Sequence, residues 1–185
     1  IGELRDGESV DALLGLAFAE DDSGAAARTA LGLLPPASVD DQLMERFRRS
    51  EGQERVRAIE VLVARGTVRL VDELLDPKLL ESPIVLSATT HALRALGQAG
   101  DFGRILAFTL RLPGNLRSSM TAVLGHLARG ADEPQAILRQ CDQALRTADR
   151  ETQIALLPLY SAVQGPDAAA ALAHWVKHEN REVSN

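Results

Sequence analysis

The chain has 185 residues, of which 45% are hydrophobic, 25% charged and 3% aromatic, and its formal net charge is −6. This apolar fraction excludes intrinsic disorder, and no run of uncharged apolar residues is long enough to span a membrane. The acidic excess lies in residues 1–22, because the other residues carry 19 acidic and 19 basic side chains. The absence of a basic stripe argues against a nucleic-acid binder.

Apolar residues recur every three or four positions in six segments, which predicts six amphipathic helices. These first helices are expected at 10–20, 39–49, 68–76, 102–112, 134–146 and 166–178. A second helix follows each of the first five, and its start is marked by a polar residue or a proline. The second helices are expected to begin near Ser23, Glu51, Pro83, Asn115 and Asp149.

The second helices contain a repeated segment, which can be superimposed five times along the chain. The copies are 27–35, 58–66, 92–100, 122–130 and 155–163, and their leading alanines are 31, 34, 30 and 33 residues apart. A Leu stands four residues after the Ala in every copy except the fourth, so the two side chains share one helix face. Gly66, Gly100 and Gly130 stand at one offset and are predicted to end their helices in the left-handed conformation.

Two segments, 67–71 and 106–112, partly alternate apolar and polar residues as a strand does. Both lie between clearly bounded helical segments, so we predict helix for both. Pro158 falls inside the fifth second helix and is expected to kink it or to mark a late start.

Helix pairs repeated at this spacing predict an all-α fold, a right-handed α-solenoid of five to five and a half stacked antiparallel pairs. The pairs are expected at 10–35, 39–66, 68–100, 102–130 and 134–163, with a final helix at 166–178. We expect residues 1–185 to form a single domain. The chain starts at Ile1 without a Met, so we expect it to be a fragment of a longer chain. The acidic residues 1–22 would cap the stack or form its first pair.

The period and the motif Ala-x-x-Ala-Leu-Gly at 27–32 and 92–97 resemble short bacterial HEAT-like repeats of the phycobilisome-lyase type. The resemblance covers nearly the whole chain and implies an α-solenoid. Tetratricopeptide repeats have a similar period, but their early Trp, their Tyr and their terminal Pro have no match at the corresponding positions here.

Polar residues of the second helices form the candidate binding surface. In a stack of repeats, equivalent positions line one face, usually the concave one. Arg57, His91 and Thr121 share one offset, and Glu60 and Arg94 share another. His126 replaces the repeated Leu, so we expect it at a core position, where an imidazole needs a hydrogen-bond partner or a route to water. A histidine at the rim of the groove, one satisfied by a backbone carbonyl, and a ligand-contacting or pH-responsive one all fit this pattern.

No other motif points to a chemistry. His174 and His178 are four residues apart, but the Glu of a zinc-protease motif and a third ligand are missing, so we expect no metal and no cofactor. Cys141 lies on the apolar stripe of its helix and is expected to be a small buried side chain. The pairs Asp21-Asp22 and Asp40-Asp41 are expected at helix starts, where carboxylates meet the positive end of the helix dipole.

These observations favour a non-catalytic scaffold that binds another protein through the concave surface of the repeats. The resemblance alone implies the alternative, a lyase-like enzyme or enzyme subunit of the phycobilisome-lyase type. A HEAT-like DNA-repair glycosylase is disfavoured because residues 23–185 carry no net charge. The single cysteine fits a cytoplasmic protein and leaves a periplasmic or secreted one open.

Overall fold

The computed structural model describes residues 7–19, 21–34, 36–163 and 166–182. These residues form helices and turns, with no β-strand among them, which confirms the all-α prediction. None of the described helices has the length and apolar character needed to cross a bilayer. The chain divides into two compact units, Ile1–Leu96 and Gly97–Asn185, and each is described here by itself.

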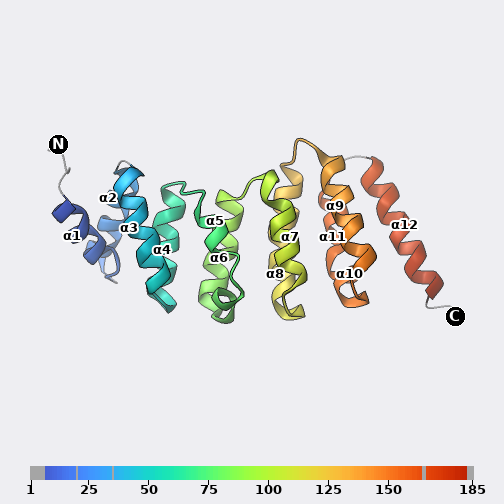
Figure 1. Cartoon of the computed structure of the whole chain (residues 1–185), viewed down its shortest axis with the longest axis horizontal. Coiled ribbons are helices and arrows are strands. Elements are labelled where there is room, and N and C mark those ends of the chain that lie inside the picture. The colour runs from blue at the N-terminus through green and yellow to red at the C-terminus, as the bar shows by residue number, and fades with distance from the viewer. Residues whose placement is uncertain (1–6, 20, 35, 164–165, 183–185) are drawn as a thin grey trace. The chain divides into compact units, whose positions relative to one another are not determined.

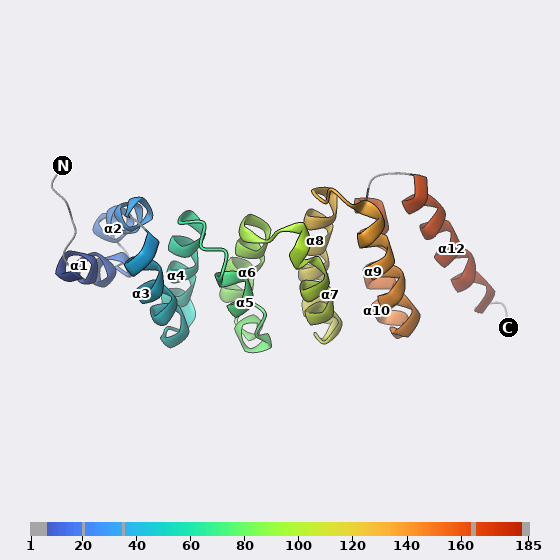
Figure 2. The same ribbon diagram turned by 45° about the horizontal axis from the view of Figure 1, so that its top comes forward.

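The first unit is built from helix hairpins. Its elements are α1 (Gly7–Ala17), α2 (Asp22–Leu33), α3 (Pro36–Arg49), α4 (Gly52–Ala64), α5 (Leu70–Glu73), the 3₁₀ helix η1 (Pro77–Glu81) and α6 (Pro83–Leu96). Helix α1 packs on α2 and α3 packs on α4, as the hairpin pattern predicts. Helix α4 also contacts both α2 and α6, so the second helices of this unit lie beside one another (Figure 1 and Figure 2).

The second unit repeats this arrangement. Its elements are η2 (Ala99–Asp101), α7 (Phe102–Leu110), α8 (Gly114–Arg129), α9 (Pro134–Thr147), α10 (Arg150–Leu156), α11 (Pro158–Ala162) and α12 (Pro166–Glu182). Helix α8 packs against α7 on one side and against α10 and α11 on the other, while α12 packs on α9 and α11. The second helices of this unit, α8 and α10–α11, therefore also lie beside one another.

The predicted helices are largely confirmed, with one local difference. The segment expected as a helix at 68–76 holds only the four residues of α5, flanked by turns. The break at Pro158 is confirmed: α10 ends at Leu156 and α11 begins at Pro158, because proline has no N–H to continue the hydrogen-bond ladder.

Only one of the three predicted left-handed glycine stops is present. Gly66 has φ 68° directly after α4. Gly100 lies inside η2, and Gly130 follows α8 with φ −93°, so the prediction was wrong for both. The same offset from the repeated Ala therefore does not give the same helix end.

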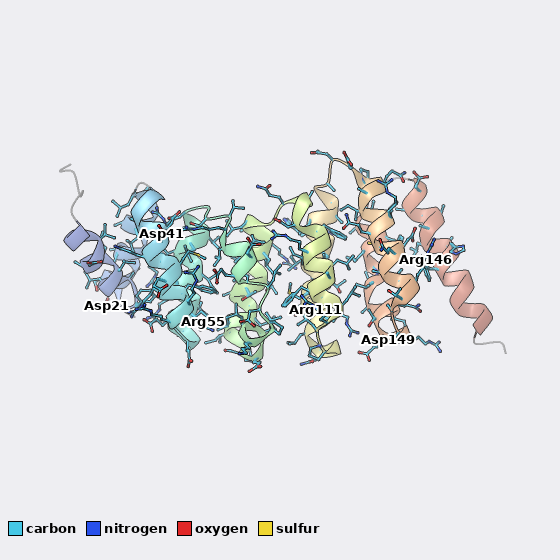
Figure 3. The ribbon with its side chains drawn as sticks, viewed as in Figure 1. Asp21, Asp41, Arg55, Arg111, Arg146 and Asp149 are labelled. Carbon is cyan, nitrogen blue, oxygen red and sulfur yellow. The ribbon has the colours of Figure 1, made fainter. Side chains whose placement is uncertain are left out.

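Asp21 and Asp149 cap two second helices, as their positions predict (Figure 3). The Asp21 carboxylate accepts a hydrogen bond from the Gly24 N–H at 3.1 Å, and the Asp149 carboxylate accepts one from the Thr152 N–H at 2.8 Å. The hydroxyl of Ser23 and the N–H of Gly24 lower the pKa of Asp21 below its usual value, because both donate to the ionised form.

The pair Asp40-Asp41 does not start a helix, contrary to the prediction. Helix α3 begins at Pro36, so both carboxylates lie past its first turn. Asp40 pairs with Arg65, whose side chain is only 2% exposed, and Asp41 pairs with Arg69 at 2.6 Å on the surface. Arg65 also donates to the Leu34 carbonyl at 2.9 Å and to the Leu31 carbonyl, and it thereby connects α2, α3 and the end of α4.

The repeated Ala and Leu positions form the core of the first unit. Ala27, Ala58 and Ala92 are buried, and Leu31 and Leu62 are fully covered. In α8 the buried pair is instead Val123 and Leu127, one residue later in the chain. The fourth repeat is therefore out of register with the repeats of the first unit by one position.

A carboxylate holds the last helix of the second unit. Asp142 on α9 accepts hydrogen bonds from the Tyr160 hydroxyl on α11 and from the Trp175 indole N–H on α12, the latter at 3.1 Å. Burial, followed by the hydrogen bond to Asp142, raises the pKa of Tyr160 above its usual value. The neighbouring Cys141 is buried as predicted, and its burial raises the pKa of its thiol to about 12.

Candidate functional site

A groove of about 530 Å³ runs between α4 and α6, the two second helices at the end of the first unit. It is lined by Val56, Ile59, Glu60, Val63, Ala64, Ile84, Ser87, Ala88 and His91. Because α4 and α6 pack directly on each other, the groove is the surface above their line of contact. Its volume falls in the range of ligand pockets, but it is open to solvent along its length.

The groove exists because both helices turn their repeated Ala and Leu away from it. Ala58, Leu62 and Ala92 are buried in the unit's core, on the other side of α4 and α6. Small side chains, such as Ala64 and Ala88, then face outward and leave a depression between the helices. Successive residues of a helix lie about 100° apart around its axis. Residues next to the core-facing stripe of α4 and α6 therefore point toward the groove.

The lining is apolar with a single fixed charge. Val56 and Ile59 form a buried floor, while Ile84 is 48% exposed, which is unusual for a large aliphatic side chain. Glu60 is the one acidic or basic side chain, other than a histidine, among the described lining residues. Glu60 is itself exposed and forms no ion pair with any described residue. The groove can therefore cover apolar groups and attract a cation, but its lining holds no Lys or Arg to pair with a phosphate.

Two of the predicted binding residues, Glu60 and His91, lie in this groove, one from each helix. Arg94 is exposed on α6 but does not line it. Arg57 is half-buried and donates a hydrogen bond to the carbonyl of Phe18, at the end of α1. Arg57 therefore joins two helix pairs of the unit and is not a free surface cation.

The prediction for Thr121 in α8 was wrong about its surroundings. Thr121 was expected to face away from the core, but it is 8% exposed and its hydroxyl donates to the Arg117 carbonyl at 3.0 Å. His126 was expected either at the rim of the groove or at a core position with a backbone partner, and it is exposed, which fits the rim. Both positions follow from the one-residue shift of register that buries Val123 and Leu127.

No hydrogen bond or ion pair joins Glu60 to His91, the two predicted residues that line the groove. No group of three His, Cys, Asp or Glu within the described part of the chain could hold a metal ion. His174 lies edge-on to Trp175, with 6.0 Å between the ring centres, and the side chain of His178 lies outside the described residues.

Two further hollows of the first unit are rich in charge. One, of about 580 Å³, lies where the end of α3, the start of α4, η1 and the start of α6 meet, near Arg55 in Figure 3. The other, of about 560 Å³, lies between α1 and α3. Both mix acidic and basic side chains, and several of these already pair with each other, as Arg48 does with Glu73 at 2.7 Å. The α1–α3 hollow is as open and as apolar as the α4–α6 groove, but it carries five charged lining residues (Asp11, Asp41, Glu45, Arg46 and Arg49) where the groove carries one.

Sequence analysis missed the apolar residues of the groove. Val63 and Ile84 were counted with the core or left unassigned, because an aliphatic residue in an amphipathic helix is normally buried. The spacing gave no warning, because Ile84 falls eight residues before Ala92 and positions eight apart belong to one apolar stripe.

No protein-family model, curated protein or solved structure matches the chain. The function must therefore be inferred from the residues of the chain itself.

Proposed function

We propose that the protein is a non-catalytic scaffold built from HEAT-like helical repeats, and that it binds another protein through the outward face of its second helices. We also propose that the helix pairs stack as a right-handed solenoid. One observation carries the proposal of binding: an open apolar groove between α4 and α6, with Ile84 48% exposed at its edge. Exposed apolar surface in a soluble protein is a common property of interaction sites.

The composition of the groove supports a protein partner over a nucleic acid. Its fixed charge is the negative Glu60, which would repel a phosphate backbone. A DNA-repair glycosylase would need the opposite charge here. A lyase-like enzyme would need a catalytic pair of residues. Glu60 and His91 line the same groove, but no hydrogen bond or ion pair joins them, so they do not support this alternative.

Quantitative affinity capture with the full chain tests the proposal. The groove variant is Ile84→Asp, which places a charge in the apolar lining. Residue 84 lies in the first turn of α6, where an Asp meets the positive end of the helix, so the fold should tolerate it. The matched control is Val68→Asp, because Val68 is 49% exposed in the turn before α5 and does not line the groove.

We expect a defined set of proteins to be captured by the wild type and by Val68→Asp, and to be lost with Ile84→Asp. Circular dichroism establishes that both variants keep their helices. If every captured protein is recovered equally with all three chains, the groove is not the binding surface.

A further inference from the structure

We propose that the α4–α6 groove binds a short amphipathic helix, and that a Lys or Arg of this helix faces Glu60. This inference rests on the proposed function and specifies the partner of the same site. It follows from three properties of the groove: its main-chain hydrogen bonds, its length and its charge.

Along most of its length the groove offers no main-chain hydrogen bonds to a partner. Apart from the first-turn N–H groups of α6, which have no intrahelical acceptor, the main chain of α4 and α6 is hydrogen-bonded within the helices, and the last carbonyls of α4 are also used. The Leu62 carbonyl accepts the Thr67 N–H at 3.0 Å, and the Val63 carbonyl accepts the Gly66 N–H at 2.9 Å. An extended peptide on this apolar surface would lose the water that is hydrogen-bonded to its own main-chain N–H and C=O groups, and it would gain no hydrogen bonds in return. A helix satisfies these groups internally, so the helix-in-groove mode fits and strand addition does not.

The length of the groove sets the length of the bound helix. The lining runs from Val56 to Ala64 on α4 and from Ile84 to His91 on α6. At the helical rise of 1.5 Å per residue, these stretches are about 10 to 12 Å long. About two turns of a partner helix cover this distance. Its apolar side chains would recur at i, i+3 or i+4, and i+7 to reach Ile84, Val63 and Ala88.

The charge of the groove selects a basic partner. Glu60 is exposed, forms no ion pair with a described residue, and lies beside apolar lining that a bound helix would cover. Removing water around the carboxylate strengthens its attraction to a cation and its repulsion of an anion. At a partly exposed site this favours a Lys or Arg over a neutral residue by about three- to fivefold in Kd.

Two displayed peptide libraries test this inference on the full chain. One holds randomised 14-residue peptides on a helix-forming background, and the other holds 14-residue peptides with a proline at every fourth position, which cannot form a helix. Both are selected on the wild type and counter-selected on Ile84→Asp. Fluorescence polarisation then measures the Kd of the best peptide for the wild type, Glu60→Lys and Val68→Asp. Ser87→Arg replaces Ile84→Asp if that variant loses its helical signal.

We expect binders from the helix-forming library, with an aliphatic stripe and a Lys or Arg. Their Kd should rise at least threefold with Glu60→Lys and stay unchanged with Val68→Asp. Peptides selected on the Glu60→Lys variant should carry Asp or Glu at the position where the wild-type binders carry Lys or Arg.

Groove-dependent binders that are acidic, or that come from the proline library, would overturn this inference and leave the proposed function standing. If neither library yields a binder sensitive to Ile84→Asp, the inference and the proposed function both fail. Sedimentation showing a dimer that Ile84→Asp dissociates would assign the groove to a second copy and also overturn the inference.

Discussion

The buried cation Arg65 provides the sharpest test of how the first unit is held together. Its side chain is 2% exposed and donates to the Asp40 carboxylate and to the carbonyls of Leu31 and Leu34. Arg65→Met keeps the aliphatic stem but removes every donor. Asp40 is then left 84% buried, since 16% of its side chain is exposed, and among the described residues it keeps the Thr67 hydroxyl at 3.3 Å as its one side-chain donor.

The expected loss of stability follows from the groups that Arg65 contacts. Removing one member of a buried ion pair costs about 3 to 5 kcal/mol, and partial access of water to Asp40 reduces this toward the lower end. Two carbonyls also lose a charged donor, each hydrogen bond being worth about 1.5 to 3 kcal/mol before water replaces it. We therefore expect Arg65→Met to lower the free energy of unfolding of the first unit by about 3 to 5 kcal/mol.

A neighbouring ion pair supplies the matched control. Arg69 and Asp41 lie 2.6 Å apart, but their side chains are 49% and 70% exposed. Surface pairs contribute under about 1 kcal/mol, so Arg69→Met should have a small effect. Urea unfolding followed by circular dichroism at 222 nm measures both variants. If Arg65→Met and Arg69→Met lower the unfolding free energy by the same amount, burial is not what makes the Arg65 contacts important.

Three further predictions concern a helix end, a thiol and the docking of α12. Gly66→Ala should lower the free energy of unfolding by about 1 kcal/mol because φ is 68° there, whereas Gly130→Ala, at φ −93°, should leave it unchanged. Equal unfolding midpoints for the two variants would refute this. The thiol of Cys141, with its pKa raised to about 12, stays protonated and covered at pH 8, so it should react with a disulfide reagent only after unfolding in urea; rapid reaction of the folded chain would contradict its burial. Asp142→Ala removes the acceptor of the Trp175 indole, and we expect the emission of this single Trp to shift to the red before the chain unfolds, while an unchanged spectrum would show that Asp142 does not hold α12.

The positions of the helices could be predicted from the sequence because their causes are local. A 3.6-residue period of apolar side chains, a carboxylate cap such as Asp149 and a proline such as Pro158 act within a few residues of themselves. The exception was the segment 68–76, where the same apolar pattern formed only one turn of α-helix. A short apolar run does not by itself distinguish a helix from a packed turn.

The candidate site was only partly predictable. Glu60 and His91 were predicted to face away from the core, and both are exposed, because α4 and α6 keep the repeated register. Thr121 was predicted to face away as well but is buried, because a shift of one residue rotates a helix face by about 100° and exchanges buried for exposed positions. Such a shift leaves the apolar period of α8 unchanged, so it is invisible in the pattern.

The order of amino acids alone therefore determined that this protein is helical and where most of its helices begin and end. Only the packing of each helix against its neighbours decided which stripe of it is covered. That packing buries Val123 in α8 and leaves Ile84 open at the edge of the α4–α6 groove. The physical reason is that helix formation depends on contacts a few residues apart, whereas burial depends on helices that are brought together from distant parts of the chain.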